Sequence, residues 1–146
     1  MKLMYGIALT VVTGLLGMGL FIYSGLFDVS AATRDSAFIR WALENTRKNS
    51  IQARLGEIST PDLTDINMIA KGAKAFDEIC ASCHGGPGTQ ALLGAADMNP
   101  SPPELSEIAD KRSAEEVFWV IKNGIRMTGM PAWGRTHNDQ QLWEMT

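Results

Sequence analysis

Cys80, Cys83 and His84 stand together in one five-residue segment, and the chain has no other cysteine. A Cys-x-x-Cys pair by itself fits a thiol–disulfide redox site or half of a zinc site. A zinc site would need two further ligands, whereas His137 is the one other histidine. A thioredoxin-like site would need alternating strand and helix patterns, which the sequence lacks. The histidine that directly follows the second cysteine instead matches the attachment motif of c-type haem.

The spacing of this motif suits covalent attachment of one porphyrin. Both thiols add across the vinyl groups and form thioethers, so the two sulfurs must reach the same edge of one ring. The next residue, His84, is then held beneath the iron, where a ring nitrogen can become the proximal axial ligand. The motif therefore predicts one covalently bound haem c, with His84 as a ligand of its iron.

A glycine-rich segment at residues 124–134 offers a second axial ligand. Met130 lies there between a glycine and a proline, which restrict the backbone on both sides of its flexible thioether. A sulfur ligand raises the potential of the iron relative to two histidines, as an electron carrier requires. We expect Met130 to be the sixth ligand. Met127 is the local competitor, and His137 is a further alternative.

Three stretches of the chain together resemble the class I monohaem cytochromes c. They are Cys80–His84 with the Gly-Gly-Pro-Gly that follows it, the segment Met-Asn-Pro-Ser-Pro-Pro-Glu-Leu at residues 98–105, and residues 122–134. The resemblance covers roughly residues 67–146. It implies an all-helical domain around one haem, with outer-sphere electron transfer as its activity. It also suggests that a proline carbonyl after the motif orients His84, and Pro87 is the nearest proline.

Several other side chains could contact the haem, and each of them also has a simpler structural interpretation. The indoles of Trp119 and Trp133 could flank the haem and reach a propionate, although aromatic core is the simpler interpretation for Trp119. Arg126 could pair with a propionate or be a solvated loop residue. Met68 and Met98 fit ordinary core filling.

The sequence predicts that helices position these residues, since it contains helix signals and no strand pattern. Residues 67–80 place apolar side chains on one face, and Gly72 allows another backbone to approach closely. Capping-box patterns at Ser113 and Asn138 open two later helices. The family's C-terminal helix usually continues past Thr146 and crosses the first helix. Either the given chain is truncated, or something else supplies that contact.

The N-terminal segment predicts a membrane anchor. Residues 3–27 contain no charged side chain, a run long enough to span a bilayer as a helix. A cleaved secretory signal is the alternative, since residues 29–31 resemble a cleavage site, but the apolar run exceeds a usual signal core. Lys2 before the run and Asp28 after it favour a cytoplasmic N-terminus. We expect a single-pass anchor at residues 1–27 in the inner membrane, with the rest on the periplasmic side.

Residues 28–61 are expected to connect the anchor to a cytochrome c domain at residues 62–146. The connector contains a helical pattern with Phe38 and Trp41 near one face, and it is rich in basic residues: Arg40, Arg47, Lys48 and Arg54. Basic side chains just outside a membrane suit anionic headgroups or an acidic patch on a neighbouring subunit. A solvated linking helix is the plainer alternative.

Composition limits the functions that this all-α chain can have. It is 45% hydrophobic with a formal net charge of −3, which argues against disorder and against nucleic-acid binding. We expect an electron carrier without a small-molecule substrate, and not an enzyme in itself. It would be a subunit of, or a tethered donor to, a respiratory or photosynthetic membrane redox complex. A haem peroxidase or gas sensor with an open iron position is the alternative.

Overall fold

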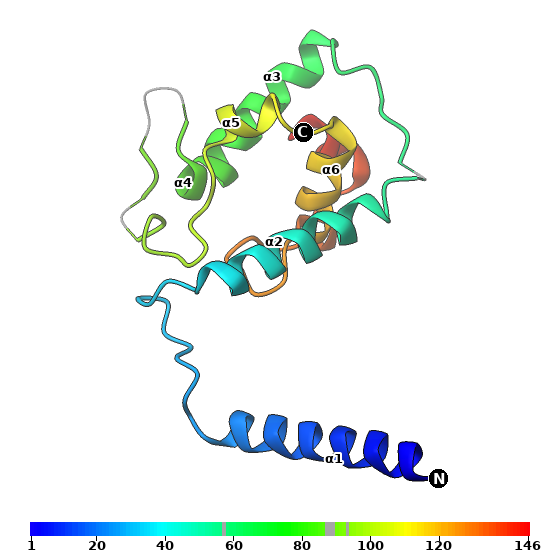
Figure 1. The fold of residues 1–146 in the computed structure, drawn as a ribbon. Coiled ribbons are helices and arrows are strands. Elements are labelled where there is room, and N and C mark those ends of the chain that lie inside the picture. Colours follow the sequence, from blue (N-terminus) through cyan, green and yellow to red (C-terminus); the bar gives the residue numbers. More distant parts are fainter. Residues whose placement is uncertain (57, 87–89, 93) are drawn as a thin grey trace. The chain divides into compact units, whose positions relative to one another are not determined.

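The computed structural model describes residues 1–56, 58–86, 90–92 and 94–146. It confirms the predicted all-α class, since none of these residues forms a strand. The chain divides into two compact units, Met1–Thr33 and Arg34–Thr146. The elements in chain order are α1 (Lys2–Tyr23), α2 (Ala37–Gln52), α3 (Ile66–Ala75), the π-helical turn η1 (Phe76–Cys80), α4 (Ala81–His84), α5 (Leu105–Ala109), α6 (Ala114–Asn123), the 3₁₀ turn η2 (Trp133–Arg135) and α7 (Asp139–Glu144) (Figure 1).

The first unit is a long apolar helix followed by a short turn. Helix α1 has 22 residues, and an 18-residue window within it has a mean hydropathy of 1.9, so it is long and apolar enough to cross a membrane. Its two threonines donate their hydroxyls to carbonyls one turn earlier: Thr10 to Gly6 and Thr13 to Leu9. These polar groups are therefore satisfied within the helix, as a hydrocarbon environment requires.

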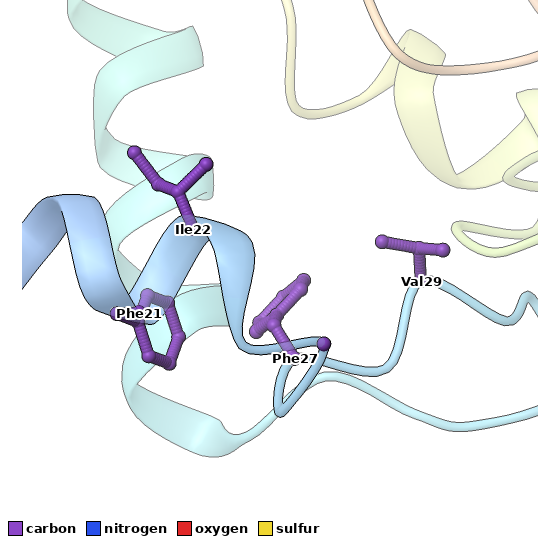
Figure 2. A pocket seen from close by; sticks show the side chains of 5 residues that line it. Phe21, Ile22, Phe27 and Val29 are labelled. Carbon is purple, nitrogen blue, oxygen red and sulfur yellow. The ribbon is translucent and has the colours of Figure 1, made fainter.

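The chain folds back on itself just after α1. The ring of Phe27 lies edge-on to that of Phe21, with 6.4 Å between their centroids. Phe21, Ile22, Phe27 and Val29 line a shallow apolar pocket beyond the helix (Figure 2). The Asp28 carboxylate then accepts hydrogen bonds from the Thr33 hydroxyl and the Ser30 backbone N–H, and both bonds lower the pKa of Asp28.

The core of the second unit forms where α6 meets α7. Its buried members are Phe118, Ile121, Leu142 and Trp143, with the rings of Phe118 and Trp143 stacked 4.1 Å apart. Both helices begin with the predicted capping boxes, at Ser113 and at Asn138. Lys122 of α6 binds Asp139 of α7 at 2.6 Å. The predicted role of Met68 is confirmed, because it packs against this cluster.

Helices α3 and α7 cross with their backbones in contact. A Cβ atom on Gly72 would lie 1.8 Å from the Glu144 carbonyl oxygen, so only glycine fits there. The predicted close approach at Gly72 is confirmed. From the sequence, the last helix was expected to be too short to contact the first helix of the domain. Instead α7 reaches α3 within six residues, and Lys71 pairs with Glu144 at 3.4 Å.

Helix α2 belongs to the second unit through its last turn. Ile51 is buried, and the Gln52 side-chain amide donates to the Glu116 carboxylate of α6. Glu116 is itself buried and also accepts from Arg112 and from the Ser113 backbone N–H. This shared carboxylate ties the connector helix to the start of α6. The boundary placed at residue 61 from the sequence stays a prediction.

Candidate haem-binding site

The motif residues lie at the end of one continuous helical segment. Helix α3 runs directly into the wide turn η1, which ends at Cys80, and α4 then carries Cys83 and His84. The Ala81 N–H bonds to the carbonyl of Phe76, five residues earlier, and such π-type turns are frequent at functional sites. Gly85 ends the segment with a φ of +66°. Neither cysteine forms a disulfide, and both side chains, like that of His84, are half-buried, so a covalently attached group could reach them.

The loop after the motif returns to it at two points. Gly86 lies against the ring of Phe76, since a Cβ there would be 3.1 Å from the ring. The Leu92 N–H donates to the Ser82 carbonyl at 2.9 Å. Burial, and then the neighbouring Cys83, raise the pKa of the Cys80 thiol. Before haem attachment this sulfur therefore stays protonated at neutral pH, in the thiol form that adds to a vinyl group.

His84 is oriented by a backbone carbonyl that lies 19 residues further on. Its Nδ1 is 2.9 Å from the carbonyl oxygen of Pro103. A carbonyl oxygen can only accept, so Nδ1 carries the proton and Nε2 keeps its lone pair for a metal. The sequence pointed to Pro87 for this role, and Pro87 lies outside the described residues. The signal that could have found Pro103 is the Pro-Pro step at 102–103, in a stretch with few backbone N–H groups to engage its carbonyls.

The methionine loop closes on Gly124. That glycine has a φ of +64°, and a Cβ on it would come within 2.7 Å of the Met130 carbonyl oxygen. The Met130 N–H donates to the Thr128 hydroxyl, and its carbonyl accepts from Ile125. Met130 is half-buried against the α6–α7 core, whereas Met127 is 87% exposed. The two candidate sulfur ligands therefore differ sharply in how firmly the fold holds them.

The position of Met98 differs from the one expected from the sequence. It was expected to fill the core, but it is 37% exposed, and a Cβ on Gly129 would be 2.9 Å from its sulfur. Its thioether therefore packs against the residue that precedes Met130. The expectation of core filling was wrong here because a methionine next to three prolines sits in a loop, where helical periodicity gives no guide.

The remaining candidates are spread around the methionine loop. Trp133 is half-buried in η2 and packs against the core, with its ring edge-on to His137 at 5.6 Å. The Nδ1 of His137 lies 2.9 Å from the Thr136 hydroxyl. Trp119 is half-buried in α6, and Arg126 is exposed. The cofactor roles of these four residues stay predictions.

The residues present fit a covalent c-type haem. Two thiols lie within one turn of a histidine whose Nδ1 is engaged by a carbonyl, which leaves Nε2 for a metal, and the half-buried thioether of Met130 is a further soft ligand on the chain. Within the part of the chain that the structure describes, no three His, Cys, Asp or Glu side chains gather to bind a metal ion directly. The chemistry that this donor set supports is one-electron transfer at a porphyrin-bound iron.

The comparisons with known proteins agree with this assignment. The family described as cytochrome c oxidase, cbb3-type, subunit III matches residues 67–146, from the start of α3 to α7. The matched range includes the cysteine motif, Pro103 and the methionine loop. Neither the curated proteins nor the solved structures gave a match.

Proposed function

The chain belongs to the cbb3-type cytochrome c oxidase subunit III family of c-type cytochromes, and we propose that it is a membrane-anchored one-electron carrier. The observation that carries this proposal is the setting of His84. Its Nδ1 donates to the Pro103 carbonyl while both motif thiols lie beside it on the same helical segment. A histidine held in this way has the tautomer and the orientation that an axial iron ligand needs.

Bound haem c supplies reversible exchange of one electron between Fe(II) and Fe(III). The chain's own residues supply the rest. Cys80 and Cys83 would hold the ring through thioethers, His84 would present Nε2, and Met130 would present its sulfur from the loop that closes on Gly124. The Pro103 hydrogen bond makes His84 a stronger donor, and the thioether of Met130 favours the reduced iron.

An electron carrier suits the site better than a haem peroxidase or gas sensor. Those functions need an open iron position and distal acid–base groups. In this proposal Met130 fills that position, and His137 is already engaged, since it packs on Trp133 and contacts Thr136. The native reduced protein should therefore bind carbon monoxide poorly. Ready carbon monoxide binding in visible spectra of the reduced full chain would contradict the carrier proposal.

Helix α1 supports an anchored protein with its haem unit outside the cytoplasm. Its length and hydropathy suit a single span, and Lys2 and Asp28 flank it in the order that places the N-terminus inside. Haem attachment to Cys-x-x-Cys-His on the periplasmic side agrees with this orientation. Alkaline carbonate extraction of membranes tests the anchor: the haem-stained chain should stay in the pellet, and its release would show a cleaved or peripheral protein.

A membrane oxidase complex is the partner that the family membership supports. A tether keeps the haem at a high effective concentration beside one partner, on the order of millimolar. The small residues Gly14 and Gly17 would let a partner helix approach α1 closely. Mild-detergent extraction, native electrophoresis and haem staining should show the chain in a larger stoichiometric species. Migration only as a small haem protein would favour an independent tethered carrier.

A further inference from the structure

The first half of α2 carries two large aromatic side chains that no described part of the second unit covers. Phe38 is 72% exposed and Trp41 is 61% exposed. Their rings stack on each other, with centroids 6.0 Å apart and 29° between the planes. The helix is held to the unit at its other end, where Ile51 is buried and the Gln52 side chain donates a hydrogen bond to Glu116 of α6 (Figure 1). The fold therefore presents this aromatic pair at its surface.

Basic side chains accompany the pair along the same helix. Arg40, Arg47 and Lys48 are exposed, and Glu44 is the only acidic residue of α2. The helix thus has a formal charge of +2, from three basic residues and one acidic residue, in a chain whose net charge is −3. Lys48 is seven residues after Trp41 and so lies on the same face. Arg40 and Arg47 lie about a third of a turn around the helix from Trp41, on the side away from Phe38, and so flank the pair. We call Phe38, Trp41, Arg40, Arg47 and Lys48 the α2 aromatic–basic surface.

The chain itself limits what this surface can meet. Residues 24–36, thirteen in all, join the end of α1 to the start of α2. Fully extended, they reach about 45 Å. The hydrogen bonds of Ser30 and Thr33 to Asp28 shorten this reach further. In the anchored chain of the proposed function, on which this step rests, the start of α2 therefore stays within about 45 Å of the end of the span.

We propose that the α2 aromatic–basic surface binds the lipid headgroup region of the membrane. Stacked aromatic rings favour the boundary between headgroups and acyl chains, and basic side chains favour anionic lipid phosphates. A helix that carries both aromatic and basic side chains and is tethered to a membrane span has a high effective concentration beside the lipid surface. The haem-binding unit then has two attachments to the membrane, the span and α2, and presents one side to the bilayer.

Amide hydrogen exchange of the full haem-bearing chain in lipid nanodiscs tests this proposal. Exchange in residues 37–45 should be slower in discs with anionic phosphatidylglycerol than in discs of phosphatidylcholine alone, by at least about threefold. The variant Arg40→Gln/Arg47→Gln/Lys48→Gln should lose this lipid dependence. The variant Phe38→Ser/Trp41→Ser should exchange fast in both kinds of disc.

A matched control exists on the same helix. Leu43 is 54% exposed and lies nearly opposite Trp41, so Leu43→Ser loses at least as much helix propensity as Phe38→Ser/Trp41→Ser but leaves the aromatic pair intact. It should keep the lipid-dependent slowing. If residues 37–45 exchange equally fast in wild type and in Phe38→Ser/Trp41→Ser, in both kinds of disc, the proposal that α2 binds lipid is overturned. The anchor at α1 is not affected by that result. Failure of the chain to co-elute with the discs would instead overturn the anchor, and with it the tether on which this inference rests.

Discussion

The Nδ1 of His84 donates to the backbone carbonyl of Pro103, at 2.9 Å across 19 residues of chain. The bond links the end of α4 to the segment that leads into α5. It thereby makes the orientation of the expected iron ligand depend on a loop that is remote in sequence. Because the acceptor is a backbone carbonyl, no side-chain substitution at Pro103 removes it directly.

Replacing Met130 with alanine should remove the sixth ligand. We expect loss of the weak sulfur-to-Fe(III) charge-transfer band, a lower reduction potential and new carbon monoxide binding. Visible spectroscopy and redox titration measure these changes. Met127→Ala is the matched control, because Met127 is 87% exposed, and it should leave the band intact. Loss of the band in Met127→Ala alone would assign the ligand to Met127.

Replacing Cys80 or Cys83 with alanine should leave one thioether. A vinyl group that stays unreacted extends the conjugation of the ring, so the reduced absorption band should shift to longer wavelength. Haem staining after denaturing electrophoresis should still detect the single-cysteine variants, and the double variant should lose its stain. An unshifted band in both single variants would contradict attachment through two thioethers.

Replacing Gly72 with alanine should destabilise the second unit. Alanine is the better helix former, yet its Cβ would overlap the Glu144 carbonyl, so we expect a net loss of about 1–3 kcal/mol in the free energy of unfolding. Urea unfolding followed by circular dichroism measures this. Gly56→Ala, where the added methyl meets open space, should change stability little. An unchanged midpoint for Gly72→Ala would contradict the backbone contact of α3 with α7.

Replacing Thr60 with valine should change how stability depends on pH. Hydrogen bonds from Thr60, and then Ser113, hold the pKa of Glu115 below its usual value of 4.5. A carboxyl group whose pKa is lowered by folding stabilises the fold above that usual value, and this contribution is lost as pH falls through the folded pKa. Thr60→Val should therefore be less stable than wild type near neutral pH, with the difference vanishing in acid.

Unfolding free energies measured between pH 3 and pH 7 check this sign. Thr60→Ser keeps the hydroxyl and should retain the wild-type profile. A difference between Thr60→Val and wild type that stays constant across this pH range would show that the valine acts through packing and not through Glu115.

Local signals in the sequence predicted the features that depend on a few neighbouring residues. Ser113 with Glu116, and Asn138 with Gln141, form their capping boxes as expected, because both partners lie within one helical turn. Gly72 was predicted to be a point of close backbone approach because a glycine on the apolar face of a helix lets another backbone come near. The family match confirms the class of the cysteine motif, whose chemistry resides in five consecutive residues.

Contacts between remote loops could not be predicted in the same way. The approach of Pro103 to His84, and of Met98 to Gly129, depends on the path of irregular chain after the motif. The bond from Gln52 to Glu116 spans 64 residues and brings a helix assigned to the connector into the second unit. Periodicity and capping describe elements one at a time, and they say nothing about which element meets which.

The crossing of Gly72 with Glu144 has a consequence for the order in which the molecule is completed. The segment that bears both thiols is synthesised some sixty residues before α7, on whose last residues the crossing depends. Until those residues are made, the α3 face at Gly72 lacks the backbone that packs against it. The packing of α7 on α3 is therefore among the last contacts of the described second unit that can form as the chain is made.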